Sequence, residues 1–366
     1  MSLTALNGLS SPEQQTNSYV QTLLAGFYHN RLLYGFALVV CMTAVAEAVV
    51  LKLPMDFAMV LIFSGPVLLV LVFMIILGLL MEMLKLARQR YSGSVTKALW
   101  IKLRDDYFAA TRVSNALHAF LFMTIYMVGY TFIKKAIPTA HPFGWDPDFM
   151  ALDKMLHGGV HPYQWLAPLL NSPWITFILN FNYNIWFFVM FTLWFWQGFA
   201  ATDTKLRQHF LLGFTLTWFV GTCGLGTLFS SVGPCFYGRL YPGSETYAPL
   251  MAWLTHVNTL HPIWALNVMD ELWKNYETGK GLVNGISAMP SMHVGTSILF
   301  ATLGFASGKR WLGFLLSGFA MLIMLGSVHL GWHYAIDGYI GAVVAMLGWW
   351  LAGKLVQWDR QSRGVA

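Results

Sequence analysis

Residues 331–351 read "GWHYAIDGYIGAVVAMLGWWL". An imidazole and a carboxylate, His333 and Asp337, stand four residues apart at the start of this stretch, and an apolar run follows them directly. A helix that crosses a membrane needs about 20 mostly apolar residues, and ionisable side chains are costly at that depth. The stretch therefore predicts a transmembrane helix that carries polar chemistry at one end.

The composition of the whole chain also favours an integral membrane protein. Of its 366 residues, 57% are hydrophobic and 10% are charged, whereas roughly 25% are charged in an average soluble domain. The net charge of +6 fits basic cytoplasmic loops better than nucleic-acid binding. We therefore expect the bilayer as a partner and no nucleic acid. The three cysteines indicate neither a disulfide framework nor a metal site.

Eight apolar segments predict an all-α, polytopic membrane protein with about eight transmembrane helices. The first 30 residues are mixed and polar, so no cleavable signal peptide is expected. Polar side chains within the third and fourth segments must find partners inside a bundle or in a wet cavity. The segments cover residues 32–51, 57–83, 113–133, 174–199, 208–230, 288–307, 311–329 and 335–355.

Basic residues orient these spans. Fifteen of the 22 Lys and Arg residues precede the first span, follow the last one, or lie in the loops after the second, fourth and sixth spans. An eight-span topology puts all fifteen on one side, which the positive-inside rule makes cytoplasmic. Both termini are then cytoplasmic. The short loops favour a bacterial inner membrane, with residues 134–173 and 231–287 on the periplasmic side and a helix around 248–277.

The same topology brings two polar clusters to one membrane depth on the non-cytoplasmic side. One is "PSMH", residues 290–293, where the sixth span begins, and the other is "SVHLGWHYAID", residues 327–337. If the eighth span is already helical there, His333 and Asp337 share a face. The carboxylate can then fix the tautomer of His333 as an oriented base or nucleophile, while His293 supplies a proton.

Two other interpretations of these three side chains remain. Each histidine can be a polar packing residue of the bundle, although intramembrane ionisable groups are functional candidates by default. Two histidines and one aspartate can also ligate zinc, but the usual HExxH-type spacing is missing. His329, one helical turn before His333, either contributes to the site or caps the end of the seventh span.

These motifs resemble those of the type 2 phosphatidic acid phosphatase superfamily, most closely its phosphotransferase branch with the inositol phosphorylceramide and sphingomyelin synthases. The family motif Pro-Ser-Gly-His is similar to residues 290–293, with Met292 in place of glycine. The family motif Ser-Arg, five residues, His, three residues, Asp matches at His333 and Asp337, but Gly326 and Ser327 stand at its first two positions. The motif Lys, six residues, Arg-Pro is not found. The resemblance covers about the last 190 residues.

The resemblance implies a six-helix core, so we expect residues 113–366 to form the catalytic membrane domain. Residues 1–112 are then an N-terminal segment with two extra spans and a basic cytoplasmic loop. It also implies that His333 attacks phosphorus to form a phosphohistidine, that Asp337 holds the second ring nitrogen, and that His293 protonates the departing oxygen. No metal or other cofactor is implied. The substrate implied is a lipid or lipid-linked phosphate.

The Lys and Arg residues of the family motifs are missing from this sequence, so other basic residues must bind the phosphate. The outer loop offers Arg239, Lys274 and Lys280, and we expect Arg239 to clamp the phosphate because a guanidinium suits phosphate oxygens. The alternative is that Arg239 faces water or lipid headgroups. Ser291, within the first polar cluster, is a further candidate phosphate ligand.

Three functions follow from these patterns. A phosphate site with few positive charges suits a singly charged phosphodiester. This favours a phosphotransferase that moves a headgroup between lipids or onto a lipid-linked alcohol. A lipid phosphate phosphatase is the alternative, with water as the acceptor. A transporter that uses Asn180, Asn182 and Asn184 as a polar path ranks third, because the sequence lacks repeat symmetry.

Overall fold

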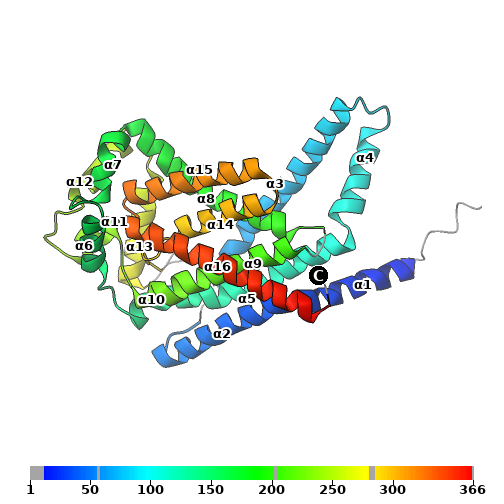
Figure 1. Ribbon diagram of the computed structural model, residues 1–366, viewed down its shortest axis with the longest axis horizontal. Helices are drawn as coiled ribbons and strands as arrows, with labels where there is room; N and C mark the ends of the chain where they lie inside the picture. Colours follow the sequence, from blue (N-terminus) through cyan, green and yellow to red (C-terminus); the bar gives the residue numbers. More distant parts are fainter. Residues whose placement is uncertain (1–11, 56–57, 202–203, 280–284, 365–366) are drawn as a thin grey trace, which may run out of the picture.

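The computed structural model describes residues 12–55, 58–201, 204–279 and 285–364, and within these ranges the chain is helical without any strand. Long helices run side by side in a bundle (Figure 1). Six helical segments are long and apolar enough to cross a membrane. They are α2 (Arg31–Leu51), α5 (Ala110–Ala140), α8 (Pro173–Gly198), the run of α9 into α10 (Lys205–Leu228), α15 (Arg310–His329) and α16 (Ala335–Ser362).

Each of the eight apolar segments coincides with a helix. Besides the six spans, the second segment forms α3 (Ala58–Arg88), and the sixth forms the short apolar helix α14 (Met292–Ala306). Many side chains in the first half of α3 lie outside the described residues. The all-α, polytopic membrane class is therefore confirmed, whereas the number of eight spans stays a prediction.

The outer faces of the bundle helices carry large apolar side chains. Trp311 and Phe314 of α15 are 66% and 68% exposed, and Trp350 of α16 is 61% exposed. Such faces would be unfavourable in water but are satisfied by lipid tails. The exposed aromatic and aliphatic residues therefore mark the surface that the bilayer covers.

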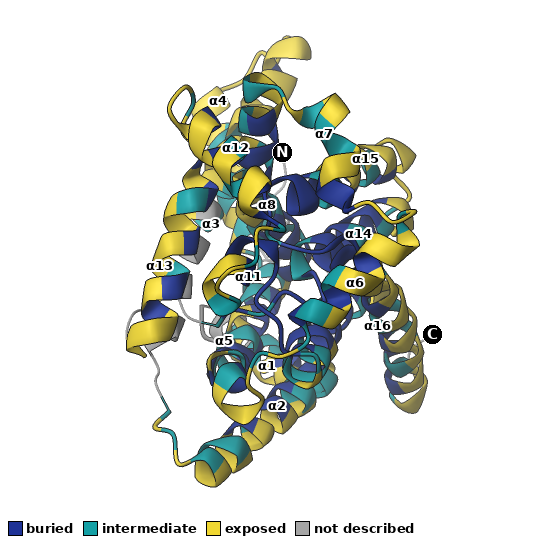
Figure 2. Cartoon of the chain, turned by 90° about the vertical axis from the view of Figure 1, so that its left-hand side faces the viewer, coloured by how far each residue is buried: buried dark blue, intermediate teal, exposed yellow. Residues whose placement is uncertain are grey.

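Short helices form a cap over one end of the bundle, at the left in Figure 1. They are α6 (Asp146–Leu156), α7 (Pro162–Leu170), α11 (Pro234–Leu240), α12 (Ala248–Asn258) and α13 (Trp264–Thr278). Figure 2 looks onto this end, and the buried residues gather at its centre beneath these helices. The single helix expected around 248–277 is wrong, because the chain breaks into α12 and α13 at Pro262, which cannot continue a helical hydrogen-bond ladder.

The opposite end of the bundle is basic. The Arg207 side chain is fully buried and donates to Asn30 Oδ1 and to the carbonyl of Asn115, both at 2.8 Å. Arg31 and Arg363 both contact the buried Asp359 carboxylate, at 2.6 Å and 2.9 Å. These contacts join the start of α2 and α9 to the end of α16. The basic residues chosen to orient the spans therefore gather at the end away from the cap.

The N-terminal helices are joined closely to the rest of the bundle. A Cβ atom at Gly129 of α5 would lie 2.9 Å from backbone atoms of Val40 and Cys41, so α2 and α5 meet at a position that only glycine allows. The ring of His118 in α5 contacts Tyr34 Oη at 2.7 Å and the carbonyl of Leu23, in α1 (Pro12–His29), at 2.9 Å. Polar groups within the third apolar segment thus find partners inside the protein.

Candidate active site

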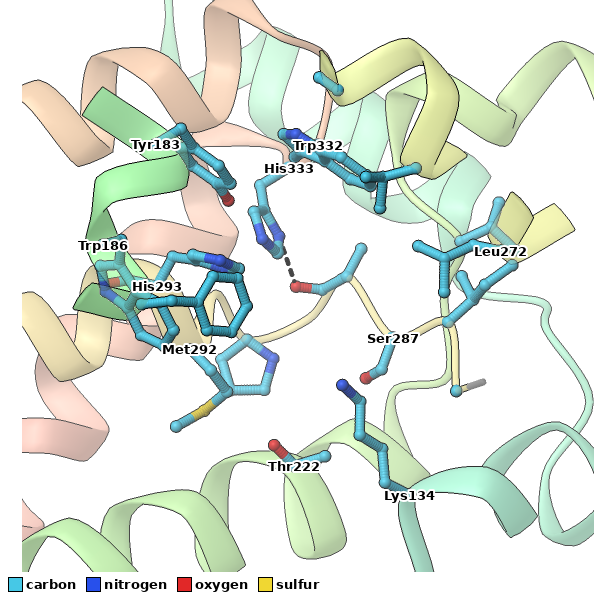
Figure 3. A pocket seen from close by; sticks show the side chains of 18 of the residues that line it. Lys134, Tyr183, Trp186, Thr222, Leu272, Ser287, Met292, His293, Trp332 and His333 are labelled. Atoms are coloured by element: carbon cyan, nitrogen blue, oxygen red, sulfur yellow. Dashed lines mark hydrogen bonds between the residues drawn. The ribbon is translucent and has the colours of Figure 1, made fainter. Parts of the chain in front are cut away.

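A cavity of about 270 Å³ opens beneath the cap. Its walls come from α5, α8, the π-helical turn Phe219–Leu225, α13 and the segment that leads into α14, together with the loop before α16. Aromatic and aliphatic side chains such as Trp186, Trp332 and Leu272 alternate with polar groups around the cavity (Figure 3). The polar lining residues are Tyr130, Lys134, Tyr183, Asn184, Thr222, Ser287, His293 and His333.

Close contacts between α14 and α16 bring the two polar clusters together. Ser291 caps the start of α14, and its backbone N–H donates to the carbonyl of Asp337 at 2.9 Å. A Cβ at Gly341 would lie 2.3 Å from the Ser291 carbonyl oxygen, and a Cβ at Gly295 would lie 2.7 Å from that of Gly341. The two glycines let the helices cross at backbone distance, which places His293 beside His333.

His333 lies in the loop before α16, not on the helix. Gly331 turns the chain at a φ of 75°, a conformation that favours glycine, and the His333 backbone N–H donates to the carbonyl of Ser327 at 3.1 Å. His333 Nδ1 lies 2.8 Å from the carbonyl oxygen of Ala288 and 3.3 Å from Asp337 Oδ2. The Ala288 carbonyl oxygen can only accept, so Nδ1 carries the proton and Nε2 keeps its lone pair.

Asp337 is fully buried and contacts two groups through one oxygen. Its Oδ2 accepts from the Tyr334 backbone N–H at 2.9 Å and lies against His333 Nδ1. His333 and Asp337 do not share a helical face, because α16 begins at Ala335 and the helix that this would require is not yet formed at His333. The pairing nevertheless forms, since the turn before the helix folds the imidazole back over the first helical turn.

His293 faces the same cavity from α14. Its ring centroid lies 6.3 Å from that of His333, and it stacks on Tyr183 at 4.4 Å and lies 4.3 Å from the Trp186 ring. In the part of the chain that the structure describes, no hydrogen bond is made to either nitrogen of the His293 ring. The ring is thus held by aromatic packing while its nitrogens stay available to a molecule in the cavity.

Similarity to a known protein family supports the same part of the chain as the site. The family model of the PAP2 superfamily matches residues 147–351, which is more than half of the chain. The chain belongs to the PAP2 superfamily. Neither the curated proteins nor the solved structures gave a significant match. Membership supports an enzyme of the phosphatase or phosphotransferase type, and the matched range includes His293, His333 and Asp337.

In this PAP2 protein, two acidic residues of α6 hold the loop that contains His333 from the cap side. Asp146 accepts from the backbone N–H groups of Val232 and Gly233 at 2.8–3.1 Å and from Tyr334 Oη at 3.0 Å. Burial raises the pKa of the Asp146 carboxyl, and these hydrogen bonds lower it by less. The contacts tie the segment before α11 to the residue that follows His333.

Asp153 is the second anchor, two helical turns further along α6. Its carboxylate accepts from the backbone N–H groups of Ala335 and Ile336, each at 3.1 Å. These are the first N–H groups of α16, which lack partners within the helix. Burial also raises the pKa of the Asp153 carboxyl. An acidic residue of the cap therefore completes the N-terminus of the helix that His333 precedes.

The remaining residues expected at the site lie elsewhere. Arg239 pairs with Asp270 on the outside of the cap and lies over the Phe236 and Trp273 rings, so it does not line the cavity. Lys274 is exposed on α13 and does not line it either, and Lys280 lies outside the described residues.

His329 and Ser291 have structural surroundings. His329 is the last residue of α15, and its Nε2 lies 2.8 Å from Thr176 Oγ1 in a fully buried contact, so it does not line the cavity. The Ser291 hydroxyl accepts from the Val294 N–H as a helix cap. Ser327, at the family's arginine position, is buried and absent from the cavity lining.

The structure also tests the two alternatives of a metal site and a polar path. No group of three His, Cys, Asp or Glu side chains among the described residues is arranged to hold a metal ion. Asn180 is fully buried, and its Oδ1 accepts from the Ala265 N–H near the start of α13, while Asn184 donates to the Asn180 carbonyl. Asn180 thus braces α8 against α13, whereas Asn184 lines the cavity.

Sequence reasoning missed Lys134, which lines the cavity from α5. The apolar segment ends at residue 133, but α5 continues to Ala140. Lys134 therefore lies one residue beyond the predicted span and inside the helix that forms it. Two adjacent lysines at the cap end of a span, Lys134 and Lys135, were the signal in the sequence.

Proposed function

We propose that this PAP2 protein is a phosphotransferase that moves a phospho-headgroup between lipids, or onto a lipid-linked alcohol, through a phosphohistidine on His333. The observation that carries this proposal is the convergence of His333 and His293 at one cavity, with Asp337 against the Nδ1 atom of His333. The aromatic and aliphatic lining residues, which include Trp186, Phe236 and Leu272, suit the apolar part of a lipid.

In the first step, the Nε2 lone pair of His333 attacks the phosphorus atom, and the bond from phosphorus to the leaving oxygen breaks. His293 donates a proton to that oxygen, so the leaving group departs as an alcohol. The His333 ring becomes positively charged. Asp337 Oδ2, 3.3 Å from Nδ1, stabilises this charge, while the Ala288 carbonyl keeps the Nδ1–H hydrogen bond.

In the second step, His293 removes a proton from the acceptor alcohol, whose oxygen attacks phosphorus as the bond to Nε2 breaks. This returns both histidines to their starting states. Splitting the transfer lets donor and acceptor use the same cavity in turn. Since water in place of the alcohol would give hydrolysis by the same steps, a lipid phosphate phosphatase is the alternative function.

The membrane orientation is part of the proposal. With the basic end of the bundle in the cytoplasm, the positive-inside rule places the cap and the cavity on the periplasmic face of a bacterial inner membrane. Both α1 and the end of α16 lie at the basic end (Figure 1), which supports our proposal that both termini are cytoplasmic. We also keep residues 113–366 as the proposed catalytic domain, because α5 supplies part of the cavity wall.

The experiment uses the purified protein in lipid nanodiscs with a lipid phosphodiester donor, with and without a long-chain alcohol acceptor. Mass spectrometry of the products should show acceptor-dependent headgroup transfer by the wild type and none by His333→Ala. Rapid release of the phospho-headgroup without an acceptor would favour the phosphatase instead. Equal turnover by His333→Ala would refute both functions.

A further inference from the structure

Lys134 presents its ammonium group to the cavity from the side of α5. Figure 3 shows the side chain rising from α5 into the cavity, with Nζ directed toward Ser287. Among the described residues that line this cavity, Lys134 is the one Lys or Arg. A molecule bound against His293 and His333 would therefore meet a positive charge from one direction.

The Lys134 stem is held in place by the segment that crosses it. A Cβ atom at Gly285 would lie 2.9 Å from Lys134 Cγ and 3.0 Å from the Lys134 carbonyl oxygen, and Gly285 has a φ of 96°. The backbone of the segment entering α14 thus packs directly on the lysine stem. Ser287 and Ala288 follow in the same segment. This one segment therefore packs on the Lys134 stem and also accepts the hydrogen bond from His333 Nδ1 at the Ala288 carbonyl.

The ammonium group has no carboxylate partner in the described parts of the chain: no ion pair or hydrogen bond to Lys134 Nζ occurs there. A charged group away from water is costly unless it is paired. A bound anion would supply the missing partner.

We propose that Lys134 binds the anionic oxygens of the substrate phosphorus, and that its single charge selects a phosphodiester monoanion over a phosphomonoester dianion. This inference rests on the proposed function, because it places phosphorus between Lys134 and His333. Lys134 lies before residue 147, where the family match begins, so this cation comes from a helix that the family model does not cover. Lys134 would then bind the phosphate, which is the role that the sequence analysis expected of Arg239.

The experiment measures binding without turnover, through the fluorescence of the tryptophans in the cavity wall, Trp186, Trp218 and Trp332. The probes are dihexyl phosphate, which is a monoanionic diester, hexyl phosphate, which is a monoester, and neutral trihexyl phosphate. The wild type should bind dihexyl phosphate more tightly than either of the other two. Because a hydrogen bond to a charged group contributes about 1.5–3 kcal/mol, Lys134→Met should weaken dihexyl phosphate binding by about 10- to 100-fold and leave trihexyl phosphate binding unchanged.

Two variants provide controls. Lys134→Arg keeps the charge and should retain affinity within about threefold of the wild type, which shows that the site folds. Lys135→Met removes the same charge from the next residue of α5, which is exposed and does not line the cavity, and should bind all probes as the wild type does.

The outcomes separate this inference from the proposed function. If Lys134→Met and Lys135→Met bind dihexyl phosphate equally well while His333→Ala is inactive, Lys134 is not the anion site and the function stands. If Lys134→Met loses binding but His333→Ala still turns over, the anion site stands and the phosphohistidine route fails. Tighter wild-type binding of hexyl phosphate than of dihexyl phosphate would overturn the selection of a diester.

Discussion

Replacing Asp337 by asparagine removes one charge from the site and little else. The asparagine Oδ1 can still accept from the Tyr334 N–H, as Asp337 Oδ2 does at 2.9 Å, so α16 should keep its start. At the 3.3 Å between His333 Nδ1 and Asp337 Oδ2, a positive ring is stabilised by about 5 kcal/mol at an effective dielectric constant of about 20. Since about 1.4 kcal/mol is a tenfold change in rate, Asp337→Asn should lower kcat by about 10³- to 10⁴-fold.

The assay is headgroup transfer under saturating donor, with KM measured alongside, because the ring charge develops only as phosphorus is attacked and KM should change little. Asp359→Asn is the matched control. Asp359 is equally buried on the same helix and pairs with Arg31 and Arg363 at the basic end, so its loss should lower Tm but leave kcat within about twofold. If Asp337→Asn keeps more than about a tenth of wild-type kcat, the charge assigned to this carboxylate is refuted.

Four further results are expected. His293→Gln should slow first-turnover release of an alkyl leaving group by about 10²- to 10⁴-fold but slow the first-turnover release of p-nitrophenol far less, because that leaving group needs no proton; equal losses in this first step would contradict an acid role. Asp153→Asn should destabilise the protein by about 1–2 kcal/mol, read as a lower Tm, and an unchanged Tm would show that α16 needs no cap from α6. Burial raises the pKa of the Asp146 carboxyl above 3.8, so the folded state holds that proton more tightly than the unfolded state and the contribution of Asp146 to stability falls as pH rises through the raised pKa. The Tm advantage of the wild type over Asp146→Asn should therefore shrink as pH rises from 3.8 through the raised pKa, and a widening gap would reverse the sign. Arg239→Met should leave kcat/KM within about twofold, because Arg239 pairs with Asp270 outside the cavity, and a large loss would restore it as a phosphate ligand.

The arrangement of the spans was largely readable from the sequence. Apolar length located the helices, and the alternation of basic loops placed residues 290–293 and 327–337 at one end of the bundle. The meeting of His293, His333 and Asp337 follows from that topology, because helices of a bundle that start at one end bring those ends together. Hydropathy and charge were therefore sufficient to predict the main residues of the candidate site.

The parts that could not be read depend on tertiary contacts. The position of His333 before α16 depends on the turn at Gly331, which a helical spacing rule does not include. The partners of Asp146 and Asp153 could not be predicted from the sequence, because both carboxylates accept from backbone N–H groups far along the chain. Arg239 was chosen for its place in the sequence, but α11 directs it toward α13.

The covalent intermediate is the most direct test of the central claim. The wild type would be mixed with a donor labelled with ³²P in the headgroup phosphate, quenched in alkali within milliseconds and digested, and the labelled peptide would be located by mass spectrometry. The account predicts alkali-stable, acid-labile label on Nε2 of His333, absent from His333→Ala and chased by added acceptor alcohol. Label on His293 or Ser291, or turnover by an enzyme that never carries label, would contradict it.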